Sequence, residues 1–352
     1  MIFTLNEGNL IKRYLKKISS SQIDIYFTPE YYYLYENYND GKALFFVFEK
    51  NDEIALYPFL LNPINELGYN LDNLYSDIQG AYGYNGVISS TEDKAFIEKF
   101  YNEFNLYCTR NNIISEFTRF HPILNNHVFS KDYLEVIYDR ETVILDLTKS
   151  FNEIWKNEYS GTNRNMIRKA KDNEVIIEFN ESLNGLLKFA DLYRETMDDL
   201  NSDNYYKFDN SYFENIFHLL KSNYDLVMAY KNDELIAASL FLYYGNFYHY
   251  HLSARNREYQ KYAANNLILD KAIKKAQERG CKKFHFGGGF DKIPQNSLLK
   301  FKSNFSSQRG KFYIGKKIHN KEVYNKVIKQ WAEKNPNYEG NNNQILLRYR
   351  NH

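Results

Sequence analysis

The sequence predicts an α/β chain built from two similar halves, and three observations support this. The chain has 352 residues, too long for one ordinary domain and suited to two of about 150–180 residues. Segments with strand and helix patterns alternate along it. The tetrapeptide Lys50-Asn51-Asp52-Glu53 recurs as Lys231-Asn232-Asp233-Glu234, each time before an apolar run. Because the order of hairpin, long helix and strand also recurs, we expect an internal duplication.

In the first half, apolar runs predict strands and amphipathic spacing predicts helices. Ile11, Tyr14, Leu15 and Ile18 fall at helical spacing, so the N-terminal segment is expected to pack as an amphipathic helix. The predicted strands are residues 23–27, 43–48, 53–60, 113–118 and 141–147, and the other predicted helices are residues 31–38 and 93–112.

The second half repeats this order. The predicted strands are residues 224–230, 234–244, 247–253 and 283–286, with a long helix over residues 263–279 before the last of them. A basic helical region begins after the strand that ends at Leu147. The predicted division is therefore an N-terminal domain of residues 1–147, a C-terminal domain of residues 148–335 and a polar tail of residues 336–352.

The balance of charge excludes some partners and the cysteines indicate a compartment. The net charge of +1 gives no overall field for nucleic acid, so a DNA-binding module is not expected. Cys108 and Cys281 have no metal-ligand spacing and no partners for a disulfide framework, which favours a reducing compartment. No signal-like or membrane-spanning run occurs, so we expect a cytoplasmic protein with at most peripheral membrane contact through its first helix.

The densest motif is a glycine run followed by a helix that carries a lysine. Gly287, Gly288 and Gly289 follow a strand and let a ligand approach the main chain closely. Phe301 and Phe305, four residues apart, are expected to anchor the next helix in the core. Lys302 then projects either as a fixed positive charge suited to a diphosphate or an oxyanion, or as a solvated lysine.

Two further clusters each have a functional and a structural interpretation. Arg164, Arg168 and Lys171 lie on one helical stripe, which can hold phosphates or form a solvated basic face. The loop that begins at Asp77 presents Tyr82 and Tyr84 among three glycines, and it either lines a substrate cleft or is a structural turn.

The strand at residues 247–253 carries polar residues at alternating positions. Strict alternation places Tyr250 on one face and His249, His251 and Ser253 on the other. No carboxylate or cysteine lies at a supporting spacing for a metal, so no metal site is predicted. The pattern instead favours one of the two histidines, His249 or His251, as a proton acceptor.

Taken in order, these motifs resemble the Fem-like (FemABX) branch of the GNAT superfamily. The resemblance rests on the Arg164–Ala170 helix, Tyr250-His251-Leu252-Ser253-Ala254, Gly287–Gly289, Phe301-Lys302 with Phe305, and the loop of Tyr82 and Tyr84. It covers about residues 20–330. It implies two tandem GNAT-like domains, with mixed and mostly antiparallel sheets flanked by helices and with an acceptor cleft at or between the domains.

The resemblance also implies roles for residues. Phe301-Lys302 matches the family's essential lysine, so that role passes to Lys302, and Arg164 or Arg168 is expected to hold the acceptor's diphosphate. Two departures matter. The segment Gln260–Asn265 lacks the glycine of the GNAT pyrophosphate loop, and no heptad insertion predicts a coiled-coil arm.

The leading hypothesis is amide formation on an amine of a nucleotide- or lipid-linked cell-envelope precursor, with aminoacyl-tRNA as donor and no cofactor. Lys302 would stabilise developing negative charge, and His251, Asp77 or the substrate's phosphate would assist proton removal. The enzymatic alternative is acyl-CoA-dependent N-acylation of a nucleotide-linked amino sugar for surface polysaccharide. The alternative of another class is a scaffold that binds a glycan precursor without catalysis.

Overall fold

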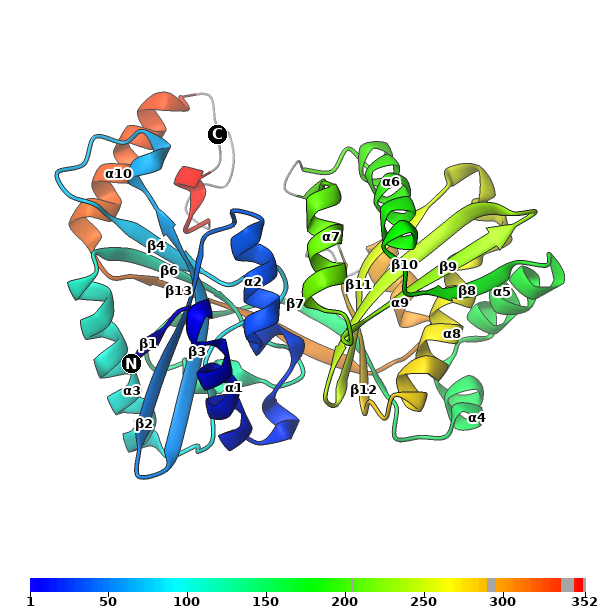
Figure 1. The fold of residues 1–352 in the computed structure, drawn as a ribbon, viewed down its shortest axis with the longest axis horizontal. Coiled ribbons are helices and arrows are strands. Elements are labelled where there is room, and N and C mark those ends of the chain that lie inside the picture. The colour runs from blue at the N-terminus through cyan, green and yellow to red at the C-terminus, as the bar shows by residue number, and fades with distance from the viewer. Residues whose placement is uncertain (204–205, 290–295, 337–344, 351–352) are drawn as a thin grey trace. The chain divides into compact units, whose positions relative to one another are not determined.

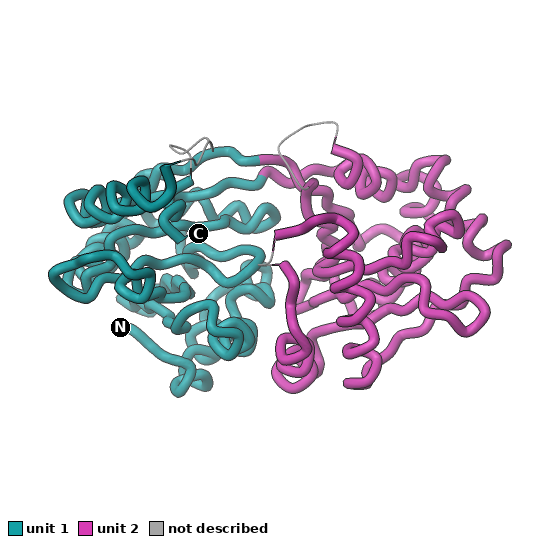
Figure 2. The backbone as a smooth tube through the Cα atoms, turned by 90° about the horizontal axis from the view of Figure 1, so that it is seen from above, with its two compact units in different colours: residues 1–139, 312–352 teal, residues 140–311 magenta. Residues whose placement is uncertain are grey.

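The chain folds into two compact units, described by a computed structural model that covers residues 1–203, 206–289, 296–336 and 345–350 (Figure 1). Unit 1 comprises residues 1–139 and 312–352, and unit 2 comprises residues 140–311 (Figure 2). The strands β7 (Glu135–Asp146) and β13 (Arg309–Ile318) carry the chain from one unit to the other. The structure thus differs from the predicted division, because the chain returns to unit 1 through β13 and adds its last strand there.

Unit 1 is a sheet covered by helices. The strand order is β1 (Ile2–Phe3), β2 (Lys42–Lys50), β3 (Glu53–Pro63), β4 (Ser76–Gln79), β6 (Ile113–Arg119) and the end of β13, with β5 (Ile88–Ser89) on β3. The helices are α1 (Gly8–Lys17), α2 (Pro29–Asn37), α3 (Lys94–Arg110) and α10 (Lys321–Lys334). Helix α3 repeats aromatic residues every fourth position, so Phe100 and Phe104 form one stripe against Phe46 and Tyr57.

Unit 2 has the same plan. The strand order is β8 (Ile176–Asn180), β9 (Tyr224–Lys231), β10 (Glu234–Tyr244), β11 (Phe247–Arg255), β12 (Lys283–Gly288) and the end of β7. The helices are α4 (Phe151–Glu153), which continues into a π-helical turn (Ile154–Glu158), α5 (Gly161–Asp172), α6 (Leu183–Asp199), α7 (Asn210–Leu219), α8 (Ala264–Glu278) and α9 (Ser297–Ser303). Helix α8 buries an apolar face against Phe241 and Tyr248, while α6 packs on β10 and β11 (Figure 1).

The two sheets correspond strand by strand, which supports the predicted duplication. In each, an antiparallel hairpin leads to a strand, a long helix and a parallel strand. The repeated tetrapeptides form the two hairpin turns. Asn51 and Asp52 have φ of 51° and 64°, and Asn232 and Asp233 have φ of 50° and 62°. Two consecutive left-handed residues define a type I′ turn, which Asn and Asp tolerate better than most residues.

Most predicted elements are present, and one is wrong. Residues 23–27 form a 3₁₀ turn (Ile25–Phe27) instead of a strand, because Asp24 caps it by accepting a hydrogen bond from the Ile25 N–H at 2.6 Å. The N-terminal helix α1 buries Ile11 and Leu15 as expected. The longest helices of the described residues, α3 and α6, have 17 residues, so no coiled-coil arm occurs in this part of the chain. None of the described helices is long and apolar enough to cross a membrane.

The predicted polar tail is partly an element of the unit 1 core. Residues 337–344 and 351–352 lie outside the described residues, but Tyr349 is fully buried and packs on Tyr324 of α10. The Tyr349 hydroxyl donates to Asp77 Oδ2 at 2.7 Å, and Arg350 Nε donates to the same oxygen at 2.8 Å. Burial raises the pKa of Asp77, and Arg350 is the largest opposing influence. These contacts fix the C-terminal segment to β4.

Replacing Arg350 should therefore destabilise the protein strongly. The variant Arg350→Ala leaves the Asp77 carboxylate buried without its cation, which costs about 3 kcal/mol of the free energy of unfolding. Denaturant unfolding measures this, and Asp77→Asn in the Arg350→Ala background should recover part of the loss. A loss below about 0.5 kcal/mol, typical of a surface ion pair, would contradict the account.

A buried carboxyl in unit 2 should make stability fall as pH rises. Asp270 of α8 is 1% exposed, and burial raises its pKa above the ordinary value of 3.8, with Lys274 opposing the rise most. The unfolded chain loses this proton at lower pH than the folded chain, so the free energy of unfolding decreases from about pH 4 upward until the folded group is ionised.

The variant Asp270→Asn should remove this decrease and stabilise the protein at neutral pH, by about 1.4 kcal/mol for each unit of the pKa shift. Chemical denaturation between pH 4 and 8 measures the effect. The matched control is Asp172→Asn, an exposed carboxylate at the end of α5. A wild-type stability that rises over this range, with no difference in the variant, would contradict the prediction.

Candidate functional site

The candidate site lies in unit 2, where the parallel strands β11 and β12 stop pairing. Their ladder joins Phe247–His249 to Lys283–His285. β11 then runs on to Arg255 and β12 to Gly288, and within the described residues no ladder pair joins them beyond His249 and His285. Main-chain N–H and C=O groups on two such edges need partners from elsewhere. An extended ligand with amide groups is one way to supply them.

Glycines at the end of β12 let a helix approach the strand. Gly287 has φ of 77°, and a Cβ there would lie 3.3 Å from Nζ of Lys302. Its left-handed backbone also produces the bulge that separates β12 from regular pairing with β7. Gly287 therefore leaves room for the Lys302 side chain. Gly288 and Gly289 complete the run, and a Cβ on Gly289 would lie 2.7 Å from Asn296.

Lys302 is buried at the end of this glycine run. It is 8% exposed on α9, and its Nζ donates a hydrogen bond to the Gly288 carbonyl at 2.7 Å. Nζ also lies 5.8 Å from the ring centre of Tyr250. Burial lowers the pKa of Lys302 to about 7. The solvated alternative for this lysine is wrong, and the ammonium is a buried charge that can be half deprotonated at neutral pH.

The two predicted apolar anchors pack together, but α9 ends at Ser303, so Phe305 lies two residues beyond the helix rather than in it. Phe305 is fully buried, stacks on Phe286 at 5.5 Å between ring centres and contacts Phe301 at 5.8 Å. Because Lys302 follows Phe301 directly, this packing turns the lysine toward β12.

Tyr250 lies beside Lys302, in surroundings that strict alternation does not predict. A bulge opposite Leu240 and Phe241 pairs Phe241 with Tyr250 and Ser239 with Ser253. Ser253 therefore shares a face with Tyr250 rather than with His249, and the alternation prediction for Ser253 is wrong. Ser253 and Ser239 hydrogen-bond the Tyr250 hydroxyl, while burial raises the pKa of Tyr250.

His251 is held as a neutral ring. Its Nε2 lies 3.0 Å from the hydroxyl of Tyr212 in α7. Burial, and then the neighbouring His249, lower the pKa of His251 to about 3. A base this weak takes a proton poorly at neutral pH, so the geometry favours His251 as a hydrogen-bond partner of Tyr212. The sequence offered no signal for Tyr212, because it is one of 33 tyrosines.

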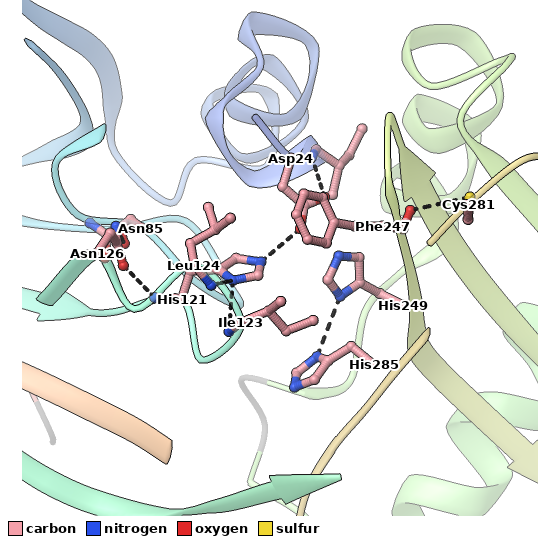
Figure 3. Close-up of polar contacts among 11 residues, drawn as sticks. Asp24, Asn85, His121, Ile123, Leu124, Asn126, Phe247, His249, Cys281 and His285 are labelled. Atoms are coloured by element: carbon pink, nitrogen blue, oxygen red, sulfur yellow. Dashed lines mark hydrogen bonds and ion pairs between the residues drawn. The ribbon is translucent and has the colours of Figure 1, made fainter. Parts of the chain in front are cut away.

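His249 has a different neighbour. Its Nδ1 lies 3.4 Å from Nδ1 of His285, its registered partner on β12 (Figure 3). The pair marks the last step of the β11–β12 ladder.

The two predicted phosphate-binding arginines have separate surroundings. Arg164 donates to the main-chain carbonyls of Tyr159 and Trp155, which closes the π-helical turn before α5. Arg168 is exposed, bonds Asn165 at 3.0 Å and lies 5.8 Å from the ring centre of Trp155. Arg164 is thus committed to its own backbone, while Arg168 keeps a surface from which it can contact a ligand.

The other three predicted site residues belong to unit 1. Asp77 is bonded by Tyr349 and Arg350, which gives it a structural role; proton transfer by Asp77 stays a prediction from sequence. The Tyr82 carbonyl accepts from the Tyr31 hydroxyl, and the ring of Tyr84 packs against His121 at 5.4 Å.

His121 is in turn fixed within unit 1. Its Nε2 lies 2.7 Å from Oδ2 of Asp24, and its Nδ1 accepts from the N–H groups of Ile123 and Leu124 (Figure 3). The Nδ1 contacts place the ring proton on Nε2, so His121 donates to Asp24.

Unit 1 fills the position that is open in unit 2. There the parallel strands are β4 and β6, and the loop after β4 returns to bond the end of β6. The Asn85 N–H donates to the Arg119 carbonyl at 2.7 Å, and the Arg119 N–H donates to Asn85 Oδ1 at 2.8 Å. The Arg119 guanidinium also bonds the carbonyls of Gly80 and Ala81. Of the two corresponding positions, that of unit 2 is therefore the candidate active site.

Comparison with known proteins agrees with this choice of unit. Residues 159–294 match the family described as "Acetyltransferase (GNAT) domain", a stretch that includes β11 and β12 but ends before α9 and Lys302. No curated protein sequence matches the chain.

Solved structures of similar fold span nearly the whole chain. FemX matches with a TM-score of 0.68 and 15% identity, covering 92% of this chain and 98% of FemX. The C-terminal domain of a putative lysylphosphatidylglycerol synthetase from Agrobacterium fabrum matches at 0.53 and 11%, covering 94% and 96%. A tandem GNAT protein from the clavulanic acid biosynthesis pathway matches at 0.50 and 7%, covering 90% and 97%. Residues 159–294 of unit 2 thus match a GNAT acetyltransferase domain, and the chain as a whole shares its fold with FemX and with the tandem GNAT protein.

Proposed function

We propose that the chain is an aminoacyltransferase that forms an amide bond on an amine of a cell-envelope precursor, with aminoacyl-tRNA as donor. The observation that carries the proposal is the buried Lys302, whose Nζ lies at the Gly288 carbonyl, at the end of β12 where no ladder pair of the described residues joins it to β11. The tandem fold shared with FemX and the named activity of the lysylphosphatidylglycerol synthetase support an aminoacyl donor.

The proposed chemistry is direct transfer. The neutral amine of the acceptor attacks the ester carbonyl of the donor, and negative charge develops on the carbonyl oxygen. The ammonium of Lys302 stabilises that oxygen in a site largely closed to water. The C–O bond of the ester then breaks, the amine nitrogen loses a proton and the departing hydroxyl gains one. Burial makes the charged form of Lys302 unfavourable in the free protein. The anion that develops in the transition state offsets this desolvation free energy.

Acyl-CoA is the second candidate donor, favoured by the edge of β11 beyond His249, which no described residue of β12 pairs and which suits an extended chain with amide groups. The segment before α8 lacks the usual glycine, yet Ala263 takes the left-handed conformation with φ of 56°. The backbone shape that a glycine commonly provides is therefore present without it. The acceptor in this version is the amine of a nucleotide-linked sugar.

Replacing Lys302 should separate a cationic role from a neutral one. We expect Lys302→Met to lower kcat about 10²- to 10³-fold, as for other lost oxyanion partners. If the ammonium acts as a cation, kcat/KM of the wild type should fall on the alkaline side of about pH 7, where the free enzyme loses this charge. Lys302→Arg keeps a charge at every accessible pH, so it should retain part of the activity without that alkaline decline.

The measurement is a pH profile of kcat/KM for the three proteins, with circular dichroism to show that each variant is folded. Exposed Lys300, in the same helix, gives the matched control Lys300→Met, which should behave as the wild type. An inactive but folded Lys302→Arg would show that the neutral amine is needed, and an active Lys302→Met would sink the assignment.

The donor is tested by offering both candidates to the protein. We expect amide product from charged tRNA and an envelope precursor with a free amine, and none from acetyl-CoA with the same acceptor. Product from acyl-CoA alone would select the second candidate. Tight binding of the precursor with no turnover of either donor would select a non-catalytic scaffold.

A further inference from the structure

Helix α9, which carries Lys302, depends on its neighbours for its position. It has seven residues, and helices shorter than about 12 residues are marginal without tertiary contacts. At its start, Asn296 Oδ1 accepts hydrogen bonds from the N–H groups of Leu298 and Leu299. This cap stabilises the first turn of the helix, and Asn296 also lies close to Gly289. Further contacts hold the end of the helix.

The end of α9 is bonded to the start of α5 by two residues. The Ser160 N–H donates to the Asn304 main-chain carbonyl at 2.9 Å. The Ser160 hydroxyl donates to Asn304 Oδ1, also at 2.9 Å, and accepts from the Asn163 N–H at 3.0 Å. Ser160 is the N-cap of α5, so one hydroxyl caps that helix and holds Asn304.

Neighbouring residues also join the start of α5 to the segment after α9. Tyr159 packs edge-on against Phe305 at 5.3 Å between ring centres. The Ser306 hydroxyl donates to Glu158 at 3.3 Å. The stretch 158–160 thus lies along the stretch 304–306, and Asn304 is the residue of this seam nearest in sequence to Lys302.

The lysine tolerates little displacement. Its Nζ is 2.7 Å from the Gly288 carbonyl, and a Cβ on Gly287 would already lie within 3.3 Å of it. A shift of α9 by about 1 Å is enough to break the hydrogen bond to Gly288 or to expose Nζ to water.

We infer that Ser160 and Asn304 are positioning residues, which hold α9 so that Lys302 reaches the Gly288 carbonyl. Their effect on turnover rests on the proposed function of Lys302, whereas their effect on the surroundings of Lys302 does not. The two effects need separate measurements.

The first measurement is competitive labelling of Lys302 with acetic anhydride across pH, followed by mass spectrometry of the peptide, which reports its pKa without any substrate. In the wild type the midpoint is expected at about 7. In Asn304→Ala and Ser160→Ala the midpoint should move toward the ordinary value of 10.5, because the released lysine is less buried. Ser160→Thr keeps the hydroxyl and should restore the wild-type midpoint.

The second measurement is turnover. Asn304→Ala should lower kcat about 10- to 100-fold with little change in KM. The matched control is Ser303→Ala, one residue earlier, whose hydroxyl bonds Leu299 and Arg309 but not α5. It should keep the wild-type midpoint and kcat.

The outcomes separate the two claims. Midpoints that stay at about 7 in folded Asn304→Ala and Ser160→Ala would overturn the positioning role. Midpoints that move while kcat stays unchanged would support the positioning role and overturn the catalytic role of Lys302.

Discussion

The candidate site depends on one costly interaction, the burial of the Lys302 ammonium against the carbonyl of Gly288. A cation taken out of water needs compensation, and a single carbonyl gives only part of it. The pKa of about 7 expresses that deficit. Glycines bring β12 close enough to accept the hydrogen bond, the Phe301–Phe305 packing sets the direction of the lysine, and the end of α9 is bonded to α5. Together these features hold the Lys302 ammonium in place, and an anionic ligand would supply the compensation that the Gly288 carbonyl alone does not.

The duplicated fold explains why one unit offers this site. Both units place two parallel strands side by side, and such strands diverge where their pairing ends. Unit 1 uses its own loop to bond the gap, with Asn85 and Arg119 as the connecting residues. Unit 2 leaves the edges of β11 and β12 unpaired with each other and sets a buried lysine beside them. The same strand order thus gives a structural contact in unit 1 and the candidate active site in unit 2.

Local patterns predicted much of the fold, and contacts distant in sequence determined the rest. Strands, long helices and the repeated turn were readable because hydrophobic period and Asn-Asp turns act over a few residues. The return of the chain to unit 1 through β13, and the burial of Tyr349 in what reads as a polar tail, depend on pairing partners hundreds of residues away.

The candidate site shows the same limit. The spacing of Phe301 and Phe305 and the glycine run drew attention to Lys302, and the family resemblance then implied its role. The burial of Lys302 could not be predicted, because the Phe301–Phe305 spacing is compatible with a buried or an exposed neighbouring side chain. The prediction for Arg164 failed because its guanidinium donates to main-chain carbonyls of the preceding turn. The prediction for Ser253 failed because a β-bulge, which the alternating pattern does not reveal, moves it to the other face of the strand.

The central claim is that Lys302 meets the negative charge that develops during acyl transfer. The most direct measurement is the titration of the Lys302 side chain by carbon-13 NMR, with and without a phosphonate analogue of the tetrahedral intermediate. The account predicts a midpoint of about 7 in the free protein and a midpoint more than about one pH unit higher in the complex, since one unit corresponds to about 1.4 kcal/mol of interaction with the charged form. A midpoint that the bound analogue leaves unchanged would contradict it.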